Sequence, residues 1–206
     1  LRLEETHPPH KRVSGSPLAI FAVLGKILMN RTFMGFAGIQ ALLMSVLFAY
    51  IASSSFIFQE AYGVSDFVYS ICFGLNGAAL VGGAALARKM RVQRALRFGI
   101  AGFTAAAVLV GLFLVAHAPL WLLETGLFLL LFCMGGVNPG LSALAMSAER
   151  QYAGSASAFL GFFGFSLGGA ISPLVGIGNI FYATATAIVV CALLAAALYR
   201  QMRDKT

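Results

Sequence analysis

Glu124 is the one charged residue inside a long apolar stretch, which otherwise carries no acidic or basic residue between Arg97 and Glu149. A carboxylate in apolar surroundings is costly unless it is paired or hydrated, so such a residue is a candidate for binding a proton or a cation. The alternative is that Glu124 reaches water, because Pro119 begins its helix only five residues earlier and places it near the end of the stretch. The sequence leaves both interpretations open.

Aromatic, methionine and amide side chains recur at intervals of three or four residues in four apolar stretches, so each set shares one helix face. Such faces suit a cavity for bulky amphipathic organic molecules, because they offer stacking surface, adaptable volume and few fixed hydrogen bonds. Ordinary packing between helices would use the same residues, and this alternative also stays open. The candidate substrate-binding residues are Gln40, Met44, Tyr50, Phe73, Asn76, Glu124, Phe128, Asn138, Phe162 and Ser166, and Glu124 is also the candidate for proton coupling.

The segment near 154–176 is rich in glycine and contains small residues four positions apart. This spacing is typical of helices that pack closely in a membrane. The same residues would also let the helix bend as a gate beside a cavity. The gating or packing candidates are Gly161, Gly164, Gly168, Gly169 and Pro173.

The sequence gives little support for hydrolase or metal chemistry. The run from Gly164 to Gly168 matches the G-x-S-x-G pattern of serine hydrolases, but it lies in the middle of an apolar helix instead of at a strand–helix turn. No histidine or lysine lies within the apolar stretches to activate that serine. The three cysteines lie far apart and have no cluster of other ligands, so we expect no metal site. We also expect no enzyme activity and no cofactor.

These residues are carried by an unusually apolar chain of 206 residues, 60% hydrophobic and 10% charged, with a mean hydropathy of +0.89. This composition excludes a soluble domain and a disordered chain, and it indicates a multi-span membrane protein. Five charge-free runs lie between charged positions, and the last is long enough for two helices. Unbroken apolar runs favour helices over barrel strands. The sequence predicts an all-α protein with spans near 33–58, 67–87, 97–116, 120–142, 154–176 and 180–199.

The positive charges predict the orientation of these spans. All 14 lysines and arginines fall on one side of a six-span path, which by the positive-inside rule is the cytoplasmic side and holds both termini. Their role in topology also argues against a nucleic-acid partner, despite a net charge of +7. Residues 1–31 are expected to form a cytoplasmic connecting loop with an interfacial helix, 32–199 the membrane bundle, and 200–206 a cytoplasmic tail.

Several stretches resemble one group of transporters, in the same order along the chain. They are Leu3–Thr6, Leu47–Gln59, Tyr62–Ser65, Phe73–Asn76 and Gly154–Gly161. The whole chain is similar to the C-terminal half of a major facilitator superfamily transporter, and most similar to the Bcr/CflA group of drug-resistance proton antiporters. The first residue is Leu, and the start reads like a connecting loop whose upstream part is missing.

The resemblance implies a fold in which two six-helix halves rock around a central cavity. The first, second, fourth and fifth spans here would line that cavity. It also implies multidrug efflux from a bacterial inner membrane, with amphipathic or cationic organic substrates, protons, membrane lipid and a missing six-helix half, or another chain, as partners. Two alternatives stay open: a facilitator of a small metabolite, and a non-transporting truncated subunit or scaffold.

Overall fold

The computed structural model describes residues 17–203, which form helices joined by short connections. No strand occurs in that range, and six helical segments are long and apolar enough to cross a membrane. The predicted all-α fold with six spans is confirmed. Residues 1–16 and 204–206, which include the Leu3–Thr6 motif and parts of the predicted loop and tail, lie outside the described residues. The helices are α1 (Pro17–Met29), α2 (Arg31–Ser55), α3 (Asp66–Ala87), α4 (Val92–Val115), α5 (Leu120–Ala148), α6 (Ala153–Ile171) and α7 (Ile180–Arg203).

Polar side chains at the boundaries fix where the helices start. The Asn30 Oδ1 atom accepts hydrogen bonds from the backbone N–H groups of Thr32 and Phe33, and so caps α2. Ser65 caps α3 in the same way through the Val68 N–H. These caps satisfy N–H groups that have no partner within a helix, at the points where the apolar runs begin.

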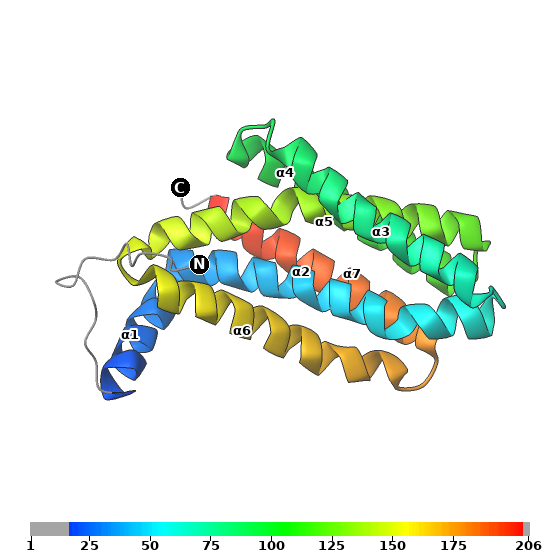
Figure 1. The fold of residues 1–206 in the computed structure, drawn as a ribbon, viewed down its shortest axis with the longest axis horizontal. Coiled ribbons are helices and arrows are strands. Elements are labelled where there is room, and N and C mark those ends of the chain that lie inside the picture. The colour runs from blue at the N-terminus through cyan, green and yellow to red at the C-terminus, as the bar shows by residue number, and fades with distance from the viewer. Residues whose placement is uncertain (1–16, 204–206) are drawn as a thin grey trace, which may run out of the picture.

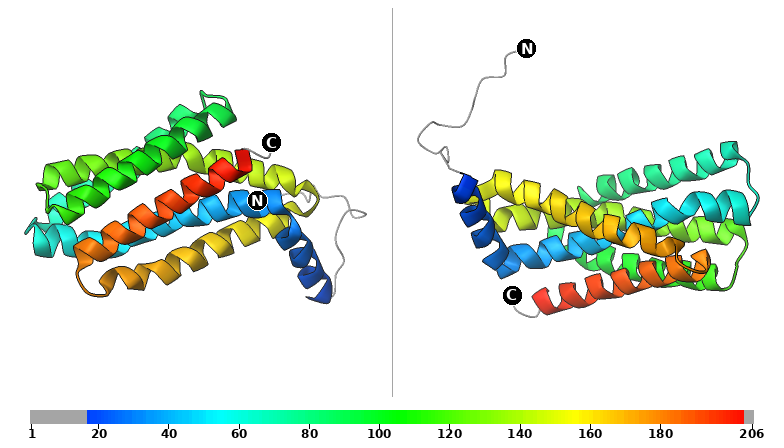
Figure 2. Two further views of the ribbon diagram at one scale, coloured as in Figure 1. Left: turned by 180° about the vertical axis from the view of Figure 1, so that it is seen from behind. Right: turned by 90° about the horizontal axis from the view of Figure 1, so that it is seen from below.

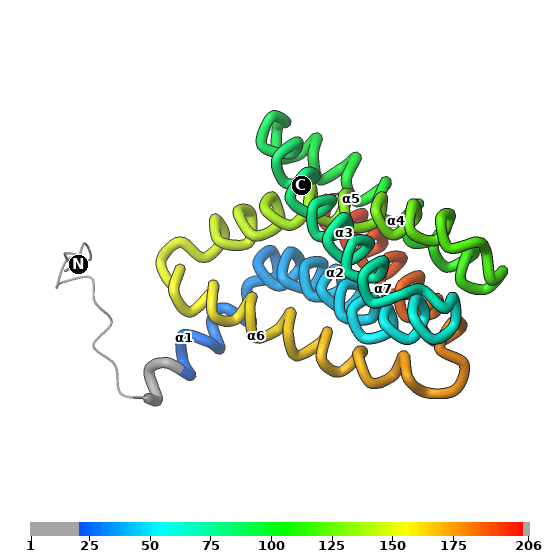
Figure 3. The backbone as a smooth tube through the Cα atoms, turned by 45° about the vertical axis from the view of Figure 1, so that its right-hand side comes forward, coloured from blue at the N-terminus to red at the C-terminus, as the bar shows by residue number. Residues whose placement is uncertain are grey.

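The helices run alongside one another, with α2 in contact with α5, α6 and α7, while α5 also packs against α3 and α4 (Figures 1 and 3). Connections 59–66, 117–119 and 177–179 lie together at one end, which we call the outer end (Figure 1). The basic residues of the described range lie at the opposite, inner end. This separation is what the charge pattern predicted, and the assignment of the inner end to the cytoplasm remains a prediction.

Three helices depart from regular α geometry. At its outer end α2 continues as a π-helical segment, Phe56–Ala61. The N–H of Tyr62, which follows this segment, donates to the Ile57 carbonyl. The fourth span runs through Pro139 and ends at Ala148, beyond the predicted end at 142. The α-helical part of the fifth span ends at Ile171, and a 3-10 turn, Ser172–Gly176, completes it. Pro173 in this turn lacks a backbone N–H, so it cannot donate the α-helical hydrogen bond at its position.

The outer end is tied together by Tyr62, which follows the π segment. Its hydroxyl donates to the Ala118 carbonyl in the connection between α4 and α5, at 2.5 Å. Burial raises the pKa of this phenol above its usual value, so it stays a hydrogen-bond donor over an even wider pH range.

Glycines set the distance between α3 and α5. A methyl group at Gly83 would overlap the Phe132 carbonyl oxygen, and one at Gly135 would overlap the Leu80 carbonyl. The two backbones therefore touch directly, as small residues allow in a membrane. This close approach brings the polar side chains of α3 against those of α5.

At the inner end, α1 projects from the bundle at an angle (Figure 2). Ile27 is fully buried and belongs to a small core formed with residues of α2, α5 and α6. Phe21 and Met29 are largely exposed. One side of α1 thus packs on the protein, and other apolar side chains face outward, an arrangement suited to a membrane interface.

Candidate functional site

Side chains from three helices meet around Asn76 of α3. The side-chain nitrogen of Asn76 donates to the Tyr50 hydroxyl oxygen on α2 and to the Glu124 Oε2 atom on α5, each at 3.1 Å. Asn76 is 1% exposed and Tyr50 4%, while Glu124 is half-buried. We call Tyr50, Asn76 and Glu124 the polar triad.

Two atoms of the polar triad lack partners. The Glu124 Oε1 and Asn76 Oδ1 atoms are both buried and accept no hydrogen bond within the described range. No lysine or arginine lies in the outer-end connections, and the structure records no basic side chain paired with Glu124 among residues 17–203. The carboxylate is therefore held from one side by a neutral amide and has one oxygen left for a proton or a cation.

Aromatic rings lie beside the polar triad. The Tyr50 ring stacks on Phe73, with ring centres 5.9 Å apart and an angle of 15° between the planes. Tyr69 packs on Phe73 and Phe58, and its hydroxyl shares a hydrogen bond with Ser54 at 2.9 Å. Phe73 remains 40% exposed. An open aromatic face next to a carboxylate is a suitable surface for an organic cation.

A second polar cluster lies nearer the inner end. The Ser142 hydroxyl of α5 donates to the Gln40 side-chain oxygen of α2 at 3.2 Å. Asn138, one turn before Ser142, has a buried side-chain oxygen without a recorded partner in the described range. Met44 packs against Gly164 of α6. This inner cluster contains no ionisable group, so it can hold helices together or bind a polar substrate group but cannot carry a proton.

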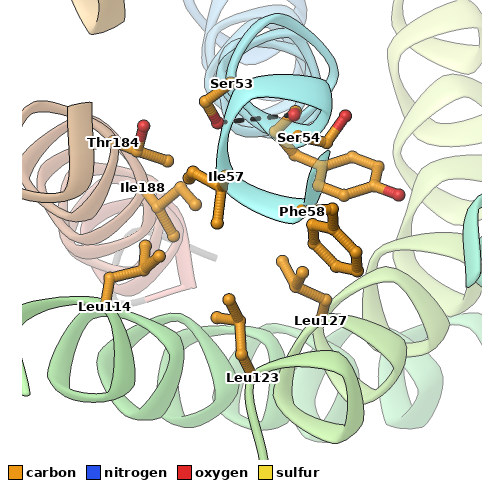
Figure 4. Close-up of a pocket in the computed structure, with 10 residues that line it drawn as sticks. Ser53, Ser54, Ile57, Phe58, Leu114, Leu123, Leu127, Thr184 and Ile188 are labelled. Atoms are coloured by element: carbon orange, nitrogen blue, oxygen red, sulfur yellow. Dashed lines mark hydrogen bonds between the residues drawn. The ribbon is translucent and has the colours of Figure 1, made fainter. Parts of the chain in front are cut away.

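A small pocket lies on the other side of Tyr50, between α2, α4, α5 and α7 (Figure 4). Its walls are mostly apolar, from Ile57 and Phe58 of the π segment to Ile188 of α7. Thr184 also lines it, and its buried hydroxyl has no recorded partner. This pocket is too narrow and too apolar to serve as the binding site of a bulky cation.

The candidates on α6 and the remaining one on α5 stand apart from the polar triad. Phe162 is 68% exposed and Ser166 is exposed, both on a sparsely buried helix. Phe128 is exposed to a lesser degree, one turn beyond Glu124 on α5. The structure thus brings together Tyr50, Phe73, Asn76 and Glu124 at the outer end, and it places Gln40, Met44 and Asn138 nearer the inner end.

The four candidate glycines of α6 divide into two pairs. Gly164 and Gly168 face Met44 and Phe48 of α2, whereas Gly161 and Gly169 are exposed, and a methyl group there would meet no atom within 4 Å. Pro173 is exposed at the start of the 3-10 turn. Only the first pair therefore packs against another helix of the described chain.

Three contributing residues were not among the predicted site residues. Tyr69 lies seven positions before Asn76, two helical turns away on the same face, and Ser142 lies four positions after Asn138. Helical spacing groups Tyr69 with Phe73 and Asn76, and the same spacing would have drawn attention to Ser142. Ser54 is one of the serines Ser53 to Ser55 near the outer end of the first polar face, and spacing does not single it out among them.

No group of histidine, cysteine or acidic residues in residues 21–203 is arranged to hold a metal ion. The three cysteines are free thiols on three different helices.

Comparison with known proteins identifies the family. The model of the major facilitator superfamily matches residues 1–173. The uncharacterised MFS-type transporter YdgK of Bacillus subtilis strain 168 is 36% identical over 184 residues, which cover 87% of this chain and 46% of that protein. The chain thus spans about half the length of the curated relative that it matches. With its six apolar helices, it is a multi-pass membrane protein and belongs to the major facilitator superfamily, a family of carriers and not of enzymes.

Proposed function

We propose that this chain forms half of a secondary active exporter of the Bcr/CflA type, which moves amphipathic organic cations out of the cell in exchange for protons. The observation that carries the proposal is Glu124. This carboxylate lies in an apolar bundle without a basic partner in the described range, and its partner Asn76 also bonds Tyr50, whose ring stacks on Phe73. A carboxylate in such a place either binds a proton or attracts a cation.

The proposed mechanism is alternating access with competition for one carboxylate. An organic cation binds beside Glu124 with its aromatic part against the exposed face of Phe73. A proton that binds Glu124 removes the negative charge and so releases the cation. Each form of the site favours a different orientation of the carrier, and alternation between them moves the two ions in opposite directions.

The complete carrier requires six further helices. The chain covers about half of its matched relative, and α3 and α6 are the least buried spans of the described bundle. We propose that a second six-helix half, on the same chain or another, closes the cavity over the polar triad. We also propose that the protein lies in a bacterial inner membrane and that its basic inner end faces the cytoplasm. The inner cluster around Gln40 and Asn138 would bind polar groups of substrates, and Phe128, Phe162 and Ser166 would line the same cavity.

Glu124→Gln in the full-length carrier tests this function. We expect efflux of ethidium, a planar organic cation, to fall about tenfold, which corresponds to a loss of about 1.4 kcal/mol of interaction. Efflux of an uncharged drug of similar size should fall less, because that drug forms no charge pair with Glu124 and loses only the coupling to the proton. The measurement is drug accumulation in cells, with and without a protonophore.

Glu60→Gln is the matched control, because Glu60 is an exposed carboxylate at the same outer end. It should leave ethidium efflux unchanged. If Glu124→Gln left resistance to every substrate unchanged, Glu124 would be an interfacial residue and the proposed coupling would be wrong.

A further inference from the structure

Asn76 occupies a position from which it contacts the charge-bearing residue but not the aromatic surface proposed for the substrate. It is almost completely buried, and its amide nitrogen directs both hydrogens at side chains of other helices, Tyr50 of α2 and Glu124 of α5. A single amide group therefore links three helices. Its oxygen has no partner in the described range.

The hydrogen bond from Asn76 requires Glu124 Oε2 to be an acceptor, so it is lost when that oxygen carries the proton. A proton taken from water and bound to Oε2 would create an O–H donor that points at the N–H donor of Asn76, and the hydrogen bond between them would be lost. A proton on Oε1 would be a buried donor without a recorded acceptor, because that atom has no partner in the described range. Protonation at either oxygen thus disfavours the arrangement seen here.

Rotation of the amide by 180° would restore hydrogen bonds to both side chains, and it would place the NH₂ group where the oxygen has no recorded partner in the described range. The oxygen and the NH₂ group of an amide are similar in size, so the rotation exchanges a donor for an acceptor at one position. The Asn76 oxygen would then accept the O–H of protonated Glu124 and the O–H of Tyr50, across the same two distances of 3.1 Å. Release of the proton to water reverses the rotation, and no other bond is made or broken.

We propose that Asn76 is a positioning residue that acts as a two-state hydrogen-bond switch, which passes the charge state of Glu124 on α5 to the hydroxyl of Tyr50 on α2. This inference rests on the proposed function, since it specifies how proton binding at Glu124 reaches a neighbouring helix. Tyr50 is the residue that stacks on Phe73, so the switch ends at the surface proposed to hold the cation.

The surroundings of the polar triad leave the switch as the main response to the proton. The titratable neighbours are Tyr50 from α2 and Tyr69 and Cys72 from α3, two phenols and a thiol. The charged residues of α4 and α7 lie at their inner ends, and α6 has none. No fixed charge among residues 17–203 is therefore placed to compensate when Glu124 gains or loses its proton.

Two transport modes of the full-length carrier in liposomes separate this role from a merely structural one. The first mode is transport of radiolabelled ethidium driven by a pH gradient, which requires Glu124 to bind and release protons. The second is exchange of labelled for unlabelled ethidium at equal pH, which does not. For Asn76→Leu we expect driven transport to fall about tenfold and exchange to fall less than about twofold.

Thr184→Val is the matched control, because Thr184 is a buried polar residue whose hydroxyl makes no recorded hydrogen bond to the polar triad in the described range. It should leave the ratio of the two modes unchanged. An equal fall of both modes in Asn76→Leu, or no fall in driven transport, would overturn the proposal.

Tyr50→Phe gives an independent test if Asn76→Leu does not reach the membrane, because it removes only the hydroxyl at the other end of the switch. We expect driven transport to fall about threefold with exchange preserved, and unchanged driven transport would overturn the switch. The wild-type carrier and Glu124→Gln measure the proposed function separately. If the wild-type carrier does not exchange ethidium for protons, or if Glu124→Gln transports it as well as the wild type, the proposed function fails, and the switch fails with it.

Discussion

The contact of α3 with α5 and the contact of α2 with α6 both use glycine, but in physically different ways. Gly83 and Gly135 face the backbone of the opposite helix, where an added methyl group would overlap a carbonyl oxygen. Gly164 and Gly168 face the side chains of Met44 and Phe48. A backbone carbonyl in a helix cannot move aside, whereas a side chain can change its rotamer. The first contact is therefore fixed in distance, and the second can adjust.

This difference matters for the proposed transport cycle. The fixed pair carries Asn76 and Glu124, whose hydrogen bond requires a constant distance between α3 and α5. The adjustable contact is made by Gly164 and Gly168, which join α6 to α2, and α6 is the helix whose glycines would let it bend as a gate. A carrier that rocks between two orientations needs rigid bodies and a contact that can slide, and the two kinds of glycine contact would supply one of each.

Gly83→Ala should have the largest effect, because its methyl group would overlap the Phe132 carbonyl and approach the Gly136 nitrogen to 2.9 Å. The helices would have to separate, and we expect a loss of about 3 kcal/mol of unfolding free energy, at the upper end of the usual cost of overpacking. Unfolding of the full-length carrier in detergent, followed by circular dichroism, measures it. Gly77→Ala is the control on the same helix, since no atom lies within 4 Å of a methyl group there. Equal stability of the two variants would contradict a fixed α3–α5 contact.

Gly168→Ala should have an intermediate effect. Its methyl group would lie 2.7 Å from the Phe48 ring, which must turn away. We expect a loss of about 1–2 kcal/mol in the same unfolding measurement. The double variant with Phe48→Leu should recover most of that loss, because the smaller side chain makes room. Failure of the second substitution to rescue stability would mean that the α2–α6 contact is as rigid as the α3–α5 contact.

Gly161→Ala should have the smallest effect on stability. A methyl group at this position meets nothing within 4 Å, so the unfolding free energy should change by less than about 0.5 kcal/mol. A fall in ethidium transport at unchanged stability would support the proposed bending of α6. A large loss of stability would instead show that another part of the complete carrier packs against this glycine.

Much of the fold could be predicted from the charges. Arg31, the cluster from Arg88 to Arg97, Arg150 and Arg200 bound apolar runs, which became the six spans, with two spans in the last run. Helix ends within apolar sequence were harder to place. Pro139 and the neighbouring Gly140 are typical of a helix end, yet α5 continues to Ala148, because a membrane helix tolerates proline where neighbouring helices pack around it.

The candidate site could be predicted only in part. Spacing placed Tyr50, Asn76 and Glu124 on the polar faces of three separate helices, but spacing within one helix contains no information about which faces meet. Their meeting depends on the closeness of α3 and α5, which Gly83 and Gly135 permit through contacts between distant positions. The switch role of Asn76 depends further on the direction in which its amide points, which only three-dimensional coordinates provide.

The π-helical segment at the outer end of α2 has a mechanical consequence. Its hydrogen bonds span five residues instead of four, so the segment holds more residues per turn than an α-helix. Tightening to an ordinary helical turn would lengthen α2 slightly and rotate Phe58 and Gln59 about its axis, while the Tyr62 tie holds the far end in place. The outer end of α2 could therefore change its register, with each hydrogen bond re-forming one residue along the chain.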